Sequence, residues 1–322
     1  CILSAINVGI IKEIDDLEEL CDLAVRALEE IIEYQRYPIK AAEISTKARR
    51  SLGVGYIGLA HFLARNKVMY NDKKAYKLVH KLTEAFQYYL LKASNELAKE
   101  RGACEYFNRT KYSDGILPID TYKSEVDSIV ENKLKYDWDG LRNDIREHGL
   151  RHSTLSAQMP SESSSVVSNA TNGIEPPRGY LSVKKSKKGP LKQIVPQYQT
   201  LKNNYTLLWD MPSNEGYIKI VAVMQKFFDQ AISGNWSYNP THFENNEVPM
   251  SQMIQDLLNT YKYGWKTSYY QNTYDYKTDP SEVDEPQHSL GWHDNVKEKP
   301  VERTEFNGTD EEYEEYCEAC AI

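Results

Sequence analysis

The sequence predicts a helix-rich α/β fold, and three observations support this interpretation. Apolar residues recur every three or four positions over long segments, as in amphipathic helices. Two short strand-like segments, 153–157 and 265–270, each follow a helical segment, an order typical of parallel strands layered against helices. The 322 residues are 40% hydrophobic and 27% charged, so the chain can bury a large core without disulfides.

In six segments the apolar residues recur with the period of an α-helix. The first begins at Asp15 and Asp16, whose carboxylates suit the positive end of a helix dipole, and it ends at Pro38. The third is the longest, and Gly102 follows it where glycine commonly caps a helix. The predicted helices cover 15–37, 41–65, 74–101, 138–148, 215–232 and 251–263.

Two long stretches, 106–118 and 171–202, lack a clear period and are expected to be irregular. The second contains the one basic cluster of the chain, four lysines within 184–188. Because Gly189 and Pro190 follow, we expect these lysines on an exposed loop. A nucleic-acid partner is not expected, because phosphate neutralisation requires clustered Lys and Arg.

The last fifty residues differ from the rest of the chain. Residues 273–322 hold 15 Asp and Glu against 4 Lys and Arg, so they carry the whole negative excess of a chain with net charge −8. They contain few aliphatic residues and cannot bury enough apolar surface to offset chain entropy. We therefore expect a folded domain over 1–272 and a disordered acidic tail over 273–322.

The number of cysteines and the length of the apolar stretches indicate where in the cell the chain is expected. Five cysteines, an odd number, disfavour a secreted disulfide framework and indicate a reducing compartment. The longest apolar stretch, 52–62, is far short of the ~20 residues that a membrane-spanning helix needs, and no secretory signal is visible. The expectation is a soluble, cytoplasmic chain without a membrane partner.

Residues 53–58 read Gly-Val-Gly-Tyr-Ile-Gly, the spacing of a dinucleotide-binding loop. That loop requires a preceding strand, whereas residues 47–50 just upstream are polar and helical in character. No acidic residue about 20 positions further on follows a second strand. We therefore attribute these glycines to close packing between helices rather than to nicotinamide binding.

The chain ends with Cys317-Glu-Ala-Cys320, a spacing that can form a disulfide or supply half of a zinc site. Two further zinc ligands are lacking, since His288 and His293 come without a second cysteine pair, so we favour redox exchange and expect no metal. Neighbouring glutamates disfavour the thiolate form. The pair therefore suits a tethered shuttle that reduces an internal disulfide and is renewed by an external redoxin.

Residues 159–165, Met-Pro-Ser-Glu-Ser-Ser-Ser, follow the first strand-like segment. Hydroxyls and free amides at a strand-to-helix turn can bind an anion such as phosphate, although a serine there more often caps the helix. The adjacent run 169–179 is dense in turn and polar residues, which favours the binding role. Tyr269 and Tyr270 lie at the end of the last strand, where alternation alone predicts one ring in the core and one at the surface.

Together these segments resemble one family, the large catalytic α subunit of class Ia ribonucleotide reductase. The resemblance extends over nearly the whole chain and includes residues 1–7 and 86–96. Its most specific parts are 159–162, 169–179 and 269–273. The resemblance implies that the chain is the second half of a ten-stranded α/β barrel followed by a disordered acidic tail.

The resemblance also implies a role for each matching residue in the barrel. Cys1 matches one of the two active-site cysteines that deliver reducing equivalents to the substrate and become a disulfide. Five residues match the segment that binds the substrate, a ribonucleoside diphosphate: Pro160, Ser161, Glu162, Ser163 and Ser164.

Two further pairs match the family. Tyr269 and Tyr270 match the stacked pair that passes the radical from the small subunit towards the active site. Cys317 and Cys320 match the tail cysteines that reduce the internal disulfide and are renewed by thioredoxin or glutaredoxin, although the family's tail cysteines are often more widely spaced.

Other parts of the family pattern lie upstream of the position that Cys1 matches. They are the cysteine that becomes the thiyl radical, the second redox cysteine and the N-terminal regulatory domain that binds effector nucleotides. The chain is therefore expected to bind no cofactor, to receive its radical from the metal-containing small subunit, and to act only with the N-terminal half of the catalytic subunit. A split gene, an excised intein and a fragment of a longer chain would each explain the start at Cys1, and we favour a split or interrupted gene.

The expected function is the reduction of ribonucleoside diphosphates to deoxyribonucleoside diphosphates by radical chemistry within that complex. The alternative is a non-catalytic binding or regulatory fragment that docks the small subunit. The absent radical cysteine favours this alternative. The serine loop, the tyrosine pair and the tail thiols disfavour it, because a binding module needs none of them.

Overall fold

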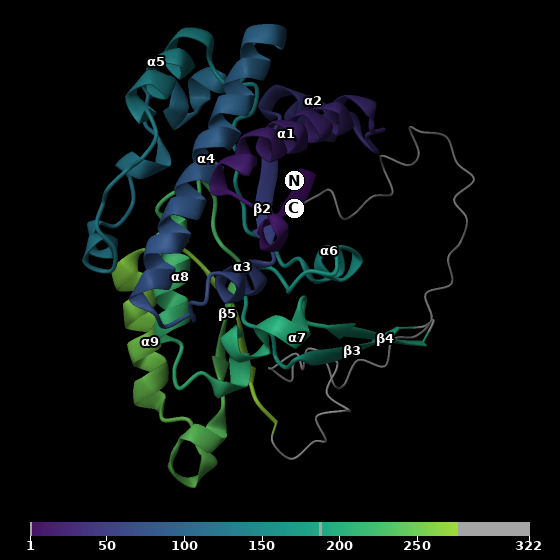
Figure 1. Cartoon of the computed structure of the whole chain (residues 1–322). Helices are drawn as coiled ribbons and strands as arrows, with labels where there is room; N and C mark the ends of the chain where they lie inside the picture. The colour runs from purple at the N-terminus through teal and green to yellow at the C-terminus, as the bar shows by residue number, and fades with distance from the viewer. Residues whose placement is uncertain (1, 187–188, 276–322) are drawn as a thin grey trace. The chain divides into compact units, whose positions relative to one another are not determined.

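The computed structural model describes residues 2–186 and 189–275. Its longer helices are α1 (Leu17–Tyr34), α2 (Lys40–Arg49), α3 (Leu59–Arg65), α4 (Lys73–Arg101), α5 (Trp138–His148), α6 (Glu162–Val167), α7 (Tyr198–Leu201), α8 (Glu215–Gln225) and α9 (Met250–Tyr263). The strands are β1 (Ile2–Asn7), β2 (Leu52–Ile57), β3 (Leu181–Ser186), β4 (Gly189–Ile194), β5 (Gly234–Tyr238) and β6 (Ser268–Thr273). The helix-rich α/β class predicted from the sequence is confirmed (Figure 1).

Five extended segments run parallel to one another in a continuous order. β1 pairs with β2 from Ile2–Leu52 to Asn7–Ile57. The segment 154–158 lies on the other side of β2, where the Val54 N–H donates to the carbonyl of Leu155 at 2.7 Å. A parallel bridge then joins this segment to Ile232, just before β5, and β5 pairs in parallel with β6. The predicted parallel arrangement of strands is therefore confirmed.

The predicted helix over 41–65 is wrong, because β2 interrupts it between α2 and α3. All six residues of β2 are buried, so the strand has no polar face and its continuous apolar run shows no alternation. A Cβ at Gly53 would lie 2.5 Å from the Leu3 side chain, and one at Gly55 would lie 2.6 Å from the carbonyl of Ala157. These glycines permit close packing between strands, not between helices as we expected.

The N-terminus of α3 is closed by the chain itself. Gly58, with φ +80°, turns the backbone from β2 into α3. The N–H groups of Gly58 and Leu59 donate to the carbonyls of Thr171 and Gly173. A dinucleotide phosphate would need such N-terminal amides, so the glycine spacing serves the fold here.

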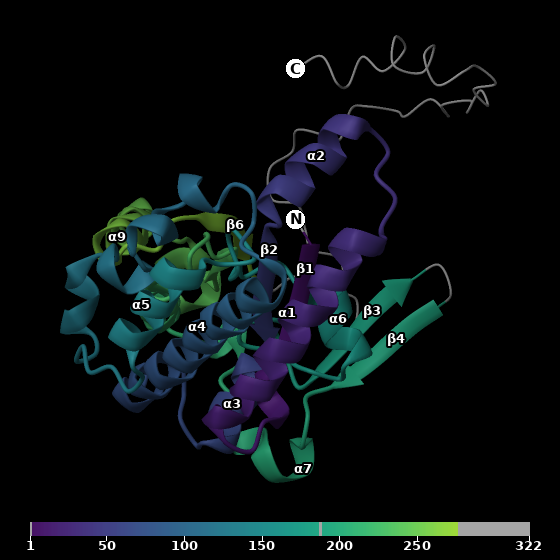
Figure 2. The ribbon, with the colours of Figure 1, turned by 90° about the horizontal axis from the view of Figure 1, so that it is seen from above.

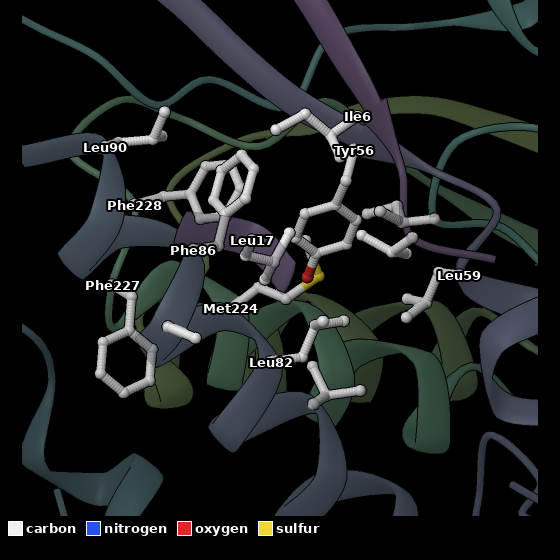
Figure 3. Close-up of a cluster of buried hydrophobic side chains, with 14 of the residues drawn as sticks. Ile6, Leu17, Tyr56, Leu59, Leu82, Phe86, Leu90, Met224, Phe227 and Phe228 are labelled. Atoms are coloured by element: carbon white, nitrogen blue, oxygen red, sulfur yellow. The ribbon is translucent and has the colours of Figure 1, made fainter. Parts of the chain in front are cut away.

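The core lies where α1, α4 and α8 meet β2. Figure 2 shows α1 and α4 side by side, and Figure 3 shows Leu17, Tyr56, Phe86 and Met224, one side chain from each of the four elements, in one cluster. Tyr56 packs edge-to-face on Phe86, with ring centroids 5.3 Å apart, and Phe86 stacks against Phe228. The Tyr56 hydroxyl lies 3.0 Å from the Thr83 hydroxyl, which satisfies the one polar atom of this ring inside the core.

Other expectations are corrected in detail. The stretch 171–202 is not wholly irregular, because β3 and β4 form an antiparallel hairpin. Lys184 and Lys185 lie in β3 rather than in the predicted loop, and Lys187 and Lys188 lie outside the described residues. The helix predicted over 215–232 ends at Gln225, and the last strand is shifted to Ser268–Thr273. Among the described residues, no helix is long and apolar enough to cross a membrane. Most of the tail expected over 273–322 lies outside the described residues.

Candidate functional site

A cavity of about 280 Å³ brings together three segments that are far apart in the sequence. Its lining includes the turn before α6, the run 169–179 and part of β6. Five of the predicted site residues line it: Pro160, Ser161, Glu162, Tyr269 and Tyr270. Ser163 and Ser164 are on α6 but are exposed and outside the lining. The structure therefore places the serine loop and the tyrosine pair around one space.

Ser161 occupies the N-cap position of α6, yet its side chain does not cap the helix. The residue is only 5% exposed, and its hydroxyl has no hydrogen-bond partner among the described residues. A buried hydroxyl without a partner is unfavourable in the unliganded protein. Because Ser161 lines the cavity, a ligand there can supply the missing partner.

Backbone amides at the start of α6 add to this donor set. The first hydrogen bond of the helix runs from the Ser165 N–H to the carbonyl of Ser161, at 2.9 Å. The N–H groups of the first turn therefore have no acceptor within the helix. The Ser165 hydroxyl also donates to the carbonyl of Ser161 and accepts from the Gly173 N–H, so it ties the turn to the run 169–179.

The two tyrosines that line the cavity contact each other. The ring centroids of Tyr269 and Tyr270 are 4.1 Å apart at an interplanar angle of 54°, a tilted contact rather than a parallel stack. The Tyr270 hydroxyl lies 3.4 Å from that of Tyr269, and this hydrogen bond raises the pKa of Tyr270. Both side chains are half-exposed, so neither ring lies in the core. Two phenols in contact can pass an electron and a proton between them.

The charged groups of the cavity include Glu162, Glu175 and Arg178. Burial raises the pKa of Glu175, against the opposing effects of Arg178 and of a hydrogen bond from the Asn235 side chain. Burial therefore disfavours the charged form of this carboxyl group. Among the described residues, no cluster of His, Cys, Asp and Glu could hold a metal ion.

The ribonucleotide reductase barrel domain matches residues 1–271 of this chain. The chain belongs to this family. Ribonucleoside-diphosphate reductase subunit alpha of Haemophilus influenzae is 60% identical over 282 residues, which are 88% of this chain and 37% of that protein. The Escherichia coli ribonucleoside-diphosphate reductase 1 subunit alpha is 58% identical over 244 residues, 76% of this chain and 32% of that protein. The enzyme's alpha subunit from phage T4 is 46% identical over 275 residues, 84% of this chain and 36% of that subunit.

This reductase-family chain spans about a third of the length of these curated relatives. Of its five cysteines, Cys1, Cys317 and Cys320 lie outside the described residues. Cys21 and Cys104 are buried free thiols, and burial raises the pKa of both. A thiol of raised pKa is a poor nucleophile, so these two are structural residues of the family fold.

Sequence reasoning did not find every residue of the cavity. Asn235 and Gln158 line it, and neither belongs to a motif that signals a site. The Gln158 side-chain amide accepts from the Tyr56 N–H and donates to the Tyr56 carbonyl in β2. This contact could be predicted only if the strand order were known. A larger cavity of about 960 Å³, next to Lys266 and Tyr106, contains none of the predicted site residues.

Proposed function

We propose that this chain forms part of a ribonucleoside-diphosphate reductase that reduces ribonucleoside diphosphates to deoxyribonucleoside diphosphates. The observation that carries the proposal is the cavity shared by the Ser161 turn and the Tyr269–Tyr270 pair. The relatives named above supply the reaction class. A purely binding fragment would not need a phenol pair in contact.

The substrate diphosphate binds at the turn before α6. Pro160 and Ser161 supply the wall and the hydroxyl there, and the amides of Ser163 and Ser164 supply donors from the first helical turn. Glu162 lines the same space and contributes an acceptor for a ribose hydroxyl. An oxyanion gains most from donors that are already fixed in a partly buried site.

Tyr269 and Tyr270 carry the radical from the small subunit to the reacting centre. The small subunit holds the metal that generates the radical, so this chain binds no cofactor of its own. Replacing the ribose 2′-hydroxyl by hydrogen consumes two electrons and two protons and releases water. Cys1 and a second thiol upstream supply them and become a disulfide, which Cys317 and Cys320 reduce by thiol exchange before thioredoxin or glutaredoxin renews them.

The five parallel segments are half of the strands of a ten-stranded barrel. The N-terminal half of the catalytic subunit supplies the other five, the thiyl-radical cysteine and the sites for effector nucleotides. This agrees with the third of the relatives' length that the chain spans. The complex acts in the cytoplasm, where the reducing conditions keep the buried thiols free.

The test is turnover by the reductase reconstituted from this chain, its upstream half and the small subunit. Tyr269→Phe should abolish the formation of deoxyribonucleotide while native mass spectrometry shows the complex intact. Tyr34→Phe, which changes an exposed phenol outside the lining of this cavity, is the control and should retain activity. Full activity of the Tyr269→Phe enzyme would contradict the relay, and an inactive wild-type complex would favour the non-catalytic binding fragment.

A further inference from the structure

The tyrosine pair lies at an irregularity in the pairing of β5 with β6. Gly234 pairs with Ser268, and Trp236 pairs with Gln271, so β5 advances by two residues where β6 advances by three. Tyr269 and Tyr270 together therefore lie opposite one residue of β5, Asn235. This is the arrangement of a β-bulge, which is uncommon between parallel strands.

The bulge explains why both rings are on one side of the strand. In a regular strand, successive side chains point to opposite faces, and two neighbouring rings would be separated by the backbone. Here the centroids are 4.1 Å apart, and both tyrosines line the same cavity. One extra residue interrupts the alternation at this place, and the phenol contact depends on that interruption.

The Asn235 side chain replaces a backbone hydrogen bond that the bulge removes from the pairing of β5 with β6. The Tyr270 N–H donates to Oδ1 of Asn235 at 3.0 Å, so a side chain replaces the backbone acceptor. The Nδ2 of the same amide donates to Oε1 of Glu175. Because both ends of the amide are engaged, its rotation is fixed, and Glu175 connects the bulge to the run 169–179 on the cavity wall.

We propose that Asn235 is a positioning residue that holds the bulge in β6 and thereby keeps the Tyr269 and Tyr270 rings in contact at the cavity. Glu175 orients the Asn235 amide and so supports the same geometry. The importance of this contact for turnover rests on the proposed function, but the effect of Asn235 on the rings can be measured without it.

Three substitutions in β5 separate the positioning role from a general effect on the sheet. Asn235→Leu keeps the size of the side chain but removes the acceptor, so pairing should revert to regular alternation and the rings should separate. Asn235→Asp keeps the acceptor for the Tyr270 N–H and removes only the donor to Glu175. Ser237→Ala is the control, because it removes a side-chain contact from a regular position of the same strand.

The measurement is the nuclear Overhauser effect between the two rings in the 322-residue chain with labelled tyrosines, assigned with Tyr269→Phe and Tyr270→Phe. We expect a strong ring-to-ring cross-peak in the wild type, Asn235→Asp and Ser237→Ala, and its loss in Asn235→Leu. A cross-peak of unchanged intensity in Asn235→Leu would overturn the proposal. If circular dichroism shows that Asn235→Leu is unfolded, Asn235→Val, which suits a strand and also lacks the acceptor, takes its place.

The reconstituted reductase gives the second readout. Asn235→Leu should lower kcat at least tenfold and leave the KM for the diphosphate within twofold, whereas Asn235→Asp should restore kcat. A general structural defect would instead change KM and would not be rescued by aspartate, and that result would overturn the proposal. Separated rings with unchanged turnover would support the positioning role and contradict the radical relay.

Discussion

Replacing Ser161 by alanine tests the central assumption about the binding site, which is that the buried Ser161 hydroxyl forms a hydrogen bond to the ligand. Ser161 is 5% exposed, and its Oγ has no partner among the described residues, so the substitution breaks no internal hydrogen bond. Ser161→Ala removes an unsatisfied buried group rather than a hydrogen bond, so it should not lower the free energy of unfolding. The variant should therefore be as stable as the wild type in urea unfolding.

Binding should respond very differently. A hydrogen bond to a charged group contributes about 1.5–3 kcal/mol, which corresponds to a rise in the Kd of the diphosphate by about 10- to 150-fold. The assay is equilibrium dialysis of cytidine diphosphate against the reconstituted reductase. Because the hydroxyl contacts the ground state and the transition state alike, KM should rise more than kcat falls.

Ser165→Ala is the matched control on the same helical turn. Its hydroxyl donates to the carbonyl of Ser161 at 2.8 Å and accepts from the Gly173 N–H, so its loss leaves a buried donor unpaired. This variant should lose about 1–3 kcal/mol of stability. If Ser161→Ala is as destabilised as Ser165→Ala, or if it binds the diphosphate within twofold of the wild type, the assignment of Ser161 to the binding site is refuted.

Three further predictions concern the core, the pH dependence and the tail. Phe86→Ala should cost about 3–5 kcal/mol in urea unfolding, because the ring is fully buried, while Tyr34→Ala, at a position 92% exposed, should change stability little. Burial alone would raise the pKa of Glu29. Hydrogen bonds from the side chains of His152, Arg50 and Arg151 outweigh burial and hold this pKa well below its usual range. The ionised Glu29 therefore contributes to the free energy of unfolding above about pH 4.3, and this contribution is lost as the pH falls further. Glu29→Gln should be less stable than the wild type at pH 7, and its stability should fall less steeply in acid. An unchanged fall of stability in acid would contradict this assignment. Changing Cys317 and Cys320 to serine should stop repeated turnover with thioredoxin and spare one round on pre-reduced enzyme, as measured by product per active site.

Periodicity predicted the amphipathic helices well, because their stripes are set locally. The segment 138–148 is α5 as observed, and 251–263 differs from α9 by one residue. β2 could not be separated from its flanking helices, because a strand buried on both faces has no polar alternation. The hairpin of β3 and β4 was likewise missed, since its lysines suggested a solvated loop.

The site was predictable only in part. The Ser161 turn has a recognisable composition, but the roles of Tyr269 and Tyr270 came from the family resemblance, and alternation alone pointed to the wrong orientation for one ring. The bulge and the part played by Asn235 depend on the register between two strands 34 positions apart, from Gly234 to Ser268. Register is set by tertiary packing, and no local pattern encodes it.

The order of the five parallel segments also bears on how the chain reaches its native state. Ile2 pairs with Leu52, and Val54 with Ser156, so adjacent segments are joined across roughly 50 and 100 residues of intervening chain. The entropy of closing such loops must be overcome before the contacts are formed, whereas α4 needs only local hydrogen bonds. Folding should be slow, with helices formed early and strand edges unpaired until late. Synthesis together with the proposed upstream half would shorten the time for which those edges can aggregate.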